Sequence, residues 1–202
     1  MKTISLAPGV PVPALGRRLP TKAASGDANR TLLRFSLNQC PLGIALIAVS
    51  PQGVCALFLG DEPEPLVADL RKRFPKATLT EETDARFDAL VRETLRQLDT
   101  PGDPRHLPLD LRGTPFQQSV WGALREIPAG STTTYLRIAE KLGRPKAFRA
   151  VAQACGANPI AIVVPCHRVI AGNGSLSGYR WGVERKRALL ERESASIRPS
   201  RS

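Results

Sequence analysis

Histidine and cysteine are scarce in this chain, and no cysteine pair has the close spacing of a metal-binding or redox motif. The two histidines and four cysteines among the 202 residues are His106, His167, Cys40, Cys55, Cys155 and Cys166. A structural zinc ion needs about four nitrogen, sulfur or carboxylate ligands at suitable spacing. Thiols in a reducing compartment normally stay unpaired. We therefore expect no metal ion, no cofactor and no disulfide framework.

Long apolar runs are also missing from the beginning of the chain. Residues 1–30 are rich in Pro, Gly, Ala and Arg and contain no stretch of the length that a secretion signal or a membrane span requires. We interpret residues 1–30 as a flexible leader. The expected location is the cytoplasm, with no membrane partner.

Basic residues outnumber acidic residues, and most of the excess lies in the second half of the chain. The chain has 29 Lys and Arg against 18 Asp and Glu, a formal net charge of +11. Residues 103–202 contribute +9 of this charge, with 16 Lys and Arg against 7 Asp and Glu. Clustered cations bind phosphates and release condensed counterions, so the second half is the candidate for nucleic-acid binding. The alternative is that the basic residues only keep the surface solvated.

The first half has the pattern of a small domain that contains both strands and helices. Short apolar runs separated by turn residues predict an antiparallel meander, and helix-like apolar spacing follows it. We expect an N-terminal α/β domain over residues 31–103 and a linker over 104–113, where Leu107–Leu111 is either a last strand or part of the linker. The predicted strands and helices are Leu32–Leu37, Gly43–Val49, Val54–Leu59, Glu64–Phe74 and Glu82–Leu98.

The second half, residues 114–194, has clear helix boundaries, and residues 195–202 are expected to be a tail. Thr114 can cap a helix whose first position is Pro115. Hydroxyl residues at 131–134 can cap a helix over Tyr135–Leu142, and a turn containing Gly143 leads to a helix over Lys146–Cys155. Two short helices joined in this way predict a helix-turn-helix.

The second helix of this pair can present a basic face to DNA. Lys146, Arg149 and Gln153 recur at helical spacing, and alanines such as Ala150 keep the helix narrow. A helix-turn-helix commonly presents its second helix to DNA. A plain helical hairpin with solvated basic residues is the alternative for this segment.

The cysteine with the most distinctive surroundings is Cys166. The apolar run Ile160–Val164 predicts a buried strand that delivers Cys166 to its end, and His167 with the surrounding positive charge favours the nucleophilic thiolate. Neighbouring residues of an extended chain point in opposite directions, so a turn or a bridging water is needed to connect the thiol and the imidazole. Glu193 can orient His167 as a third member. A lone cysteine that only fills the core is the alternative.

The residues around Cys166 resemble the active-site signature of the O6-alkylguanine-DNA alkyltransferase family. The matching segments are Pro165-Cys166-His167-Arg168-Val169-Ile170 and the run from Gly174 to Gly182. The resemblance covers residues 114–193, and a weaker one extends over 31–111. Tyr179-Arg180-Trp181-Gly182 is most similar to the alkyltransferase module of bacterial adaptive-response proteins. The resemblance implies an α+β fold, with a small ribonuclease-H-like N-terminal domain and a mostly helical C-terminal domain that carries the helix-turn-helix and a short active-site strand.

The resemblance also implies a role for individual residues. Cys166 is the alkyl acceptor, His167 activates it through a water, Glu193 holds His167, and Asn158 lies at a hinge between the DNA-binding element and the active site. Tyr135 assists nucleotide extrusion and protonates the leaving guanine. The other implied residues are Arg149, which fills the gap in the base stack, and Tyr179, Arg180, Val169 and Ser177 in the base pocket. Lys146, Gln153 and Ala150, on the same predicted helix as Arg149, are further candidates for the DNA contact.

The implied partner is double-stranded DNA with alkylated bases, approached from the minor groove by a monomer, with cooperative binding left open. The implied reaction is a single irreversible transfer of an alkyl group from O6-alkylguanine, and less efficiently from O4-alkylthymine, to Cys166 after base flipping. Proteins of the adaptive response also carry an N-terminal cysteine cluster that this sequence lacks, so we expect no gene-activator role. The alternatives are a non-catalytic reader of alkylated DNA, a sequence-specific DNA-binding regulator and a cysteine hydrolase.

Overall fold

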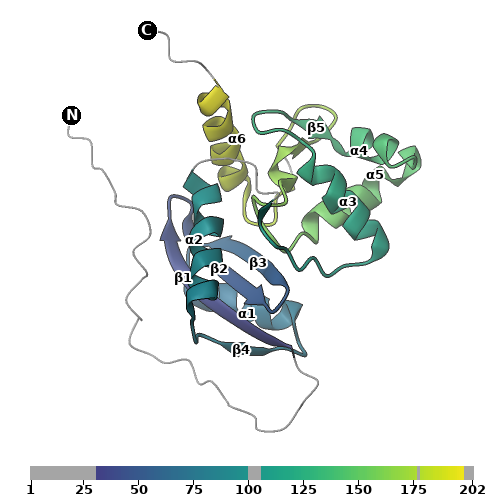
Figure 1. The fold of residues 1–202 in the computed structure, drawn as a ribbon. Helices are drawn as coiled ribbons and strands as arrows, with labels where there is room; N and C mark the ends of the chain where they lie inside the picture. Colours follow the sequence, from purple (N-terminus) through teal and green to yellow (C-terminus); the bar gives the residue numbers. More distant parts are fainter. Residues whose placement is uncertain (1–30, 100–105, 177, 198–202) are drawn as a thin grey trace, which may run out of the picture.

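A computed structural model describes residues 31–99, 106–176 and 178–197, and it contains a small sheet followed by a mostly helical half (Figure 1). The predicted mixed α+β class is confirmed. The predicted leader, residues 1–30, and residue Ser177 lie outside the described residues. Among the described residues, no helix is long and apolar enough to cross a membrane.

The sheet of the N-terminal half has four strands in the order β3-β2-β1-β4. The predicted antiparallel meander is confirmed: β1 (Leu32–Cys40) pairs with β2 (Gly43–Ser50), and β2 pairs with β3 (Gly53–Gly60). A short strand that was not predicted, β4 (Thr78–Thr80), pairs in parallel with β1. Because no strand pairs with the outer side of β3 within this sheet, that edge is available to the second half of the chain.

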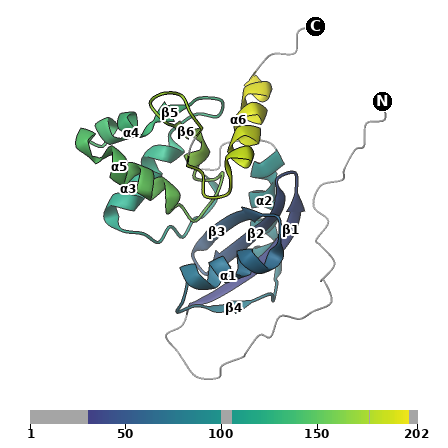
Figure 2. The ribbon, with the colours of Figure 1, turned by 180° about the vertical axis from the view of Figure 1, so that it is seen from behind.

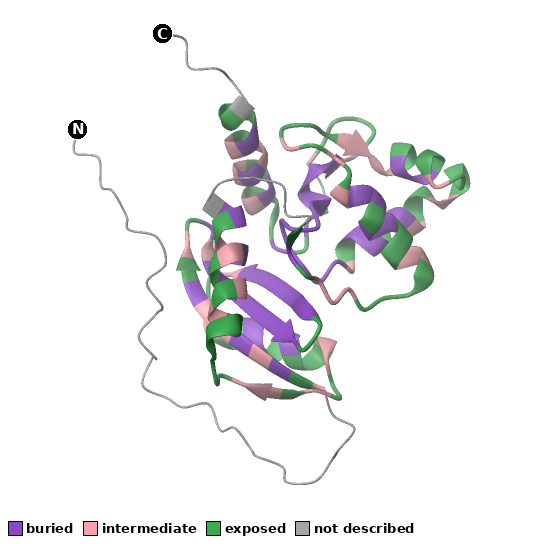
Figure 3. Ribbon diagram, in the orientation of Figure 1, coloured by how far each residue is buried: buried purple, intermediate pink, exposed green. Residues whose placement is uncertain are grey.

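Two helices cover opposite faces of this sheet, as the front and back views show (Figures 1 and 2). They are α1 (Pro63–Arg73) and α2 (Ala85–Asp99), close to the predicted ranges. Nearly every residue of β2 and β3 is buried, because both faces of these strands are covered (Figure 3). The alternation of polar and apolar residues is therefore weak in these strands.

The first two helices of the C-terminal half begin at the predicted caps. Thr114 caps α3 (Pro115–Arg125) through a capping box with Gln117, and Thr134 caps α4 (Tyr135–Lys141). The chain then turns at Gly143, whose φ of 67° suits glycine. A 3-10 turn, η2 (Pro145–Ala147), precedes α5 (Phe148–Gly156). Lys146 therefore lies in this turn and not in the α-helix where it was predicted.

The prediction of an active-site strand over Ile160–Val164 is wrong. Apart from one isolated bridge at Ile160, the segment is a buried turn in which Ile162 has a left-handed φ of 67° and Val164 N donates to Ile160 O at 3.1 Å. Burial on all sides produces the same apolar run in a strand and in a folded turn, so the pattern could not separate them.

A 3-10 turn and a two-residue strand follow this segment. They are η3 (Cys166–Arg168) and β6 (Val169–Ile170), and β6 pairs in parallel with β5 (Thr133–Thr134). The last helix, α6 (Val183–Ile197), packs against η3 and extends three residues past the predicted end of the domain at residue 194. The nucleophile candidate therefore lies in a tight turn that β6 and α6 enclose.

Candidate active site

Cys166 is held by a buried asparagine. The Asn158 side chain is fully buried, and its Nδ2 donates to Cys166 Sγ at 3.2 Å and to Val164 O at 2.8 Å. Asn158 Oδ1 accepts from Ile160 N at 2.9 Å. Both ends of the amide are therefore used, and its donor hydrogens fix the position of the sulfur.

Burial controls the protonation of this thiol. Burial raises the pKa of Cys166 to about 11, although the hydrogen bond from Asn158 and the charge of Lys186 act in the opposite direction. The thiol is therefore protonated near neutral pH. The prediction that the surroundings favour the thiolate is wrong for the protein without a substrate, because the loss of hydration outweighs the nearby positive charge.

His167 and Glu193 form the predicted pair, and Arg168 completes it. His167 Nε2 lies 2.9 Å from Glu193 Oε1, and both side chains are buried. Arg168 donates to the same carboxylate from Nη2 at 2.8 Å and from Nε at 3.0 Å to Oε2, while its Nη1 donates to Ile127 O at 2.6 Å. Gly130 N also donates to Glu193 Oε2 at 3.0 Å.

These contacts determine the charges of the pair. Burial raises the pKa of Glu193, but the hydrogen bonds from His167 and Arg168 outweigh it and lower the pKa to about 2. Burial lowers the pKa of His167, although Glu193 opposes this effect. The carboxylate is therefore ionised and the imidazole neutral at pH 7. An ionised carboxylate can only accept, so Nε2 carries the proton and Nδ1 presents a lone pair.

One buried polar atom on His167 and one on Tyr179 lack a hydrogen-bond partner among the described residues. They are His167 Nδ1 and Tyr179 Oη. The two rings meet edge to face with their centroids 6.5 Å apart, and Trp181 packs against Tyr179 at 5.2 Å. Burial raises the pKa of Tyr179 well above its ordinary value, and negative charge on Cys166 would raise it further. Buried polar groups are rarely left unpaired, so these atoms mark a place where a water or a ligand can bind.

The pairing of β5 with β6 brings Tyr135 close to Gly178, which directly precedes Tyr179. Thr133 pairs with Val169, and Tyr135 begins the helix directly after β5. Its hydroxyl lies near Gly178, where an added Cβ would be 3.5 Å from Oη. Burial raises the pKa of Tyr135, with Cys155 and Cys166 adding to the effect, so the phenol keeps its proton at neutral pH.

Two other residues predicted for the base pocket, Val169 and Arg180, have different surroundings. Val169 is buried, and its carbonyl accepts from Lys186 Nζ at 2.6 Å. Arg180 is exposed, pairs with Asp69 of α1 at 3.3 Å and lies 5.6 Å from the centroid of the Phe58 ring. The guanidinium of Arg180 thus contacts the N-terminal half.

The predicted DNA-binding face is exposed. Lys146, Arg149 and Gln153 are exposed, and Ala150 is half-buried between them. Arg149 lies 5.6 Å from the ring centroid of the exposed Phe148. The side chains of this face are therefore accessible to a binding partner such as DNA.

Two residues of the site were not predicted: Arg168, which is a partner of Glu193, and the fully buried Lys186. Arg168 has a usable signal, because a basic residue directly after a buried Cys-His pair needs a buried carboxylate. Lys186 has none, since its charged neighbours Arg185 and Arg187 on α6 suggest a solvated face.

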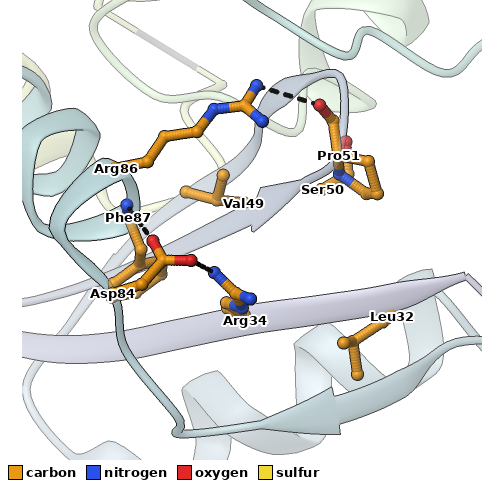
Figure 4. A pocket seen from close by; sticks show the side chains of 8 residues that line it. All are labelled: Leu32, Arg34, Val49, Ser50, Pro51, Asp84, Arg86 and Phe87. Atoms are coloured by element: carbon orange, nitrogen blue, oxygen red, sulfur yellow. Dashed lines mark hydrogen bonds and ion pairs between the residues drawn. The ribbon is translucent and has the colours of Figure 1, made fainter.

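Other parts of the described structure offer no comparable site. A hollow on the N-terminal sheet is lined by eight residues, but its charged groups are already paired: Arg34 with Asp84, and Arg86 with Pro51 O at 3.0 Å (Figure 4). Within residues 31–99, 106–176 and 178–197, no three His, Cys, Asp or Glu side chains gather as metal ligands.

Comparison with known proteins identifies relatives for most of the chain. Residues 115–195 match the family described as 6-O-methylguanine DNA methyltransferase, DNA binding domain. The chain is 44% identical to the inducible methylated-DNA–protein-cysteine methyltransferase of Bacillus subtilis, over 83% of this chain and 93% of that protein. It is 51% identical to the bifunctional transcriptional activator/DNA repair enzyme Ada of Escherichia coli, over 80% of this chain and 46% of that protein. The chain thus spans less than half the length of the Escherichia coli relative.

Solved structures show the same likeness. The crystal structure of the Mycobacterium tuberculosis O6-methylguanine methyltransferase superposes with a TM-score of 0.67 at 38% identity, over 83% of this chain and 96% of that chain. A structure of the Mycobacterium tuberculosis protein in complex with DNA superposes with a TM-score of 0.62 at 36% identity, over 81% and 93% of the two chains.

Proposed function

Because the chain belongs to the methylated-DNA–protein-cysteine methyltransferase family, we propose that it repairs DNA by taking an alkyl group from O6-alkylguanine onto Cys166. The observation that carries the proposal is the arrangement around the thiol. Asn158 donates to Sγ at 3.2 Å, while a neutral His167, paired with Glu193, keeps Nδ1 without a partner among the described residues. This arrangement provides a held nucleophile and, on the next residue of the chain, a base with a free nitrogen.

The transfer begins with removal of the thiol proton. A water between Cys166 and His167 Nδ1 relays the proton to the imidazole, and Glu193 stabilises the imidazolium that forms. The sulfur then attacks the alkyl carbon, forming a C–S bond as the bond between that carbon and guanine O6 breaks. Tyr135 supplies a proton to the leaving guanine and regains one from His167 through solvent. The products are guanine and a thioether, so each molecule reacts once.

The raised pKa of Cys166 fits this sequence of events. A thiol that is protonated in the free protein is protected from oxidation and from adventitious alkylation. His167, through its free Nδ1, can accept the thiol proton once a substrate fills the pocket and excludes bulk water. We propose that Tyr179 and Val169 line that pocket and that Arg180 lies at its rim; Ser177, the other residue predicted for the pocket, lies outside the described residues.

The substrate base must leave the duplex to reach Cys166. Guanine O6 lies within the base stack, so the nucleotide is flipped into the pocket. The exposed face of Lys146, Arg149 and Gln153 supports a role for the α4–α5 pair on DNA, with Arg149 filling the vacated stack. Small residues such as Ala150 keep α5 narrow, which suits approach along the minor groove. We propose that a monomer binds in this way, whether or not neighbouring molecules cooperate, and that O4-alkylthymine is a weaker substrate.

The finer architecture belongs to the same proposal. The order β3-β2-β1-β4, with β4 parallel to β1 and helices on both faces, supports a ribonuclease-H-like N-terminal domain. We propose that this domain covers residues 31–103, that 104–113 link it to a C-terminal domain over 114–194, and that the protein acts in the cytoplasm.

Substitution of the nucleophile tests this function. Cys166→Ser should abolish transfer of a labelled methyl group from duplex O6-methylguanine while DNA affinity stays within about twofold, because a hydroxyl is a much poorer nucleophile and the DNA-binding face is untouched. Cys40→Ser, at the end of β1, is the matched control and should transfer normally. Continued transfer by Cys166→Ser would assign the alkyl acceptor elsewhere.

A further inference from the structure

The segment that carries Asn158 is docked on the edge of the N-terminal sheet. Leu57 N in β3 donates to Pro159 O at 3.0 Å, and Ala161 N donates to Leu57 O at 2.9 Å. Leu57 and Ile160 thereby form a parallel bridge. In both ribbon views, β3 is the edge of the sheet that faces the C-terminal half (Figures 1 and 2). The N-terminal sheet therefore fixes the chain on the C-terminal side of Asn158.

A single arginine fixes the chain on the other side. Arg73, the last residue of α1, donates from Nη2 to Ala157 O at 2.6 Å. Ala157 is the C-cap of α5, where backbone carbonyls lack partners within the helix and carry the negative end of its dipole. A guanidinium is a suitable partner for such a carbonyl, because its charge strengthens the hydrogen bond.

Holding Arg73 in this position has a cost. Its side chain is half-buried, and burial together with the neighbouring Arg180 cation lowers its pKa. Arg180 is in turn compensated by Asp69, one turn before Arg73 on α1. A basic side chain without such a contact would be expected to lie in solvent, as those of Arg71 and Lys72 do on the same helix. The cost is explained if the contact with Ala157 has a function.

Ala157 directly precedes the residue that holds the sulfur. Asn158 Nδ2 reaches Cys166 Sγ at 3.2 Å, and the amide can keep this geometry only if its own backbone is held. A displacement of about 1 Å in a reacting group can lower a rate by orders of magnitude. The contact of Arg73 thus reaches the nucleophile through two residues.

We propose that Arg73 is a positioning residue for the alkyl transfer, and that it holds Ala157 so that Asn158 keeps Cys166 Sγ in line with the alkyl carbon. This inference rests on the proposed function and extends it to a side chain of the N-terminal half, outside the group of residues around Cys166. Its role is to fix the junction between the end of α5 and the Cys166 turn.

Single-turnover kinetics on duplex O6-methylguanine test the proposal, because they separate binding from chemistry. Arg73→Met should lower the limiting rate constant about tenfold, the effect of losing one charge-assisted hydrogen bond, and leave the half-saturating DNA concentration unchanged. Arg73→Lys, which keeps the charge and a donor, should recover the rate to within about threefold of wild type. Arg71→Met removes an exposed cation from the same helix and should leave the limiting rate constant unchanged.

Three outcomes would overturn the positioning role. One is a limiting rate constant for Arg73→Met equal to that of wild type. Another is an effect confined to the half-saturating concentration, which would assign the contact to DNA binding. The third is equal loss in Arg71→Met, which would make it a general charge effect. Arg73→Gln, made in parallel, gives the same comparison if the methionine variant unfolds. Absence of transfer in the wild-type protein would instead refute the proposed function.

Discussion

Replacing Glu193 by glutamine removes the charge from a buried carboxylate that ties α6 to η3 and to the loop at Gly130. Glu193 accepts hydrogen bonds from His167, Arg168 and Gly130, and it is 1% exposed. The amide introduced by Glu193→Gln would bring its own donor hydrogens into a site that offers only donors. Arg168, itself 7% exposed, would keep its charge without a counterion.

The size of the loss follows from the pKa of Glu193 and from the general cost of breaking a buried ion pair. The pKa of Glu193 is lowered from 4.5 to about 2, which corresponds to about 3 kcal/mol of stability. Breaking a buried ion pair by removing one partner costs about 3–5 kcal/mol. We therefore expect Glu193→Gln to lower the free energy of unfolding at pH 7 by about 3 kcal/mol and the melting temperature by roughly 10 °C.

The pH dependence of the stability provides a second test, because the direction of the change is also predicted. A carboxyl group with a depressed folded-state pKa stabilises the fold above its unfolded pKa, near 4.5, and this contribution is lost as the pH falls toward 2. The difference in the free energy of unfolding between the wild-type protein and Glu193→Gln should therefore shrink as the pH falls from about 4.5 to about 2.

Urea unfolding at a series of pH values measures both effects. Glu191→Gln, an exposed position on the same helix, is the matched control. A loss in Glu193→Gln below about 1 kcal/mol, the range of exposed ion pairs, or equal to the loss in Glu191→Gln, would refute the reasoning.

Three further predictions concern the nucleophile and the DNA face. Asn158→Ala should destabilise the protein by about 1–3 kcal/mol, because it removes the hydrogen-bond partner of the buried Ile160 N, and it should slow methyl transfer. Urea unfolding and single-turnover assays measure the two effects, and an unchanged transfer rate would contradict the role given to the amide. Iodoacetamide labelling of Cys166, mapped by mass spectrometry, should keep accelerating with pH up to about 11, because burial keeps the thiol protonated; a plateau below pH 8 would show a favoured thiolate. Arg149→Ala should slow repair of duplex DNA more than reaction with the free base O6-methylguanine, whereas the control Arg92→Ala, an exposed position on α2, should not. Equal losses on both substrates would exclude stack filling.

The helix boundaries could be predicted because local chemistry decides them. Thr114 and Thr134 each cap the helix that follows, and Gly143 provides the left-handed turn after α4. Capping and turn preferences act over three or four residues, so they can be read in the sequence. The pairing of His167 with Glu193 was suggested by the triad pattern and by the resemblance to the family, and the structure places the two side chains in contact.

The wrong predictions depend on contacts that are distant in the sequence. The segment Ile160–Val164 folds as a turn that is docked on Leu57, about one hundred residues earlier, and an apolar run carries no sign of that contact. The protonation of Cys166 depends on how much water the surrounding elements exclude, and a count of nearby basic residues does not measure this. The parallel pairing of β4 with β1 is equally non-local.

The central claim, transfer of one alkyl group to Cys166, is tested most directly by intact-mass spectrometry with peptide mapping after mixing the protein with a duplex that contains one O6-methylguanine. The account predicts a gain of one methyl group in place of one hydrogen, located on the peptide with Cys166 and saturating at one per chain. Tight binding to the lesion with no gain in mass would contradict the account and indicate a non-catalytic reader of damaged DNA.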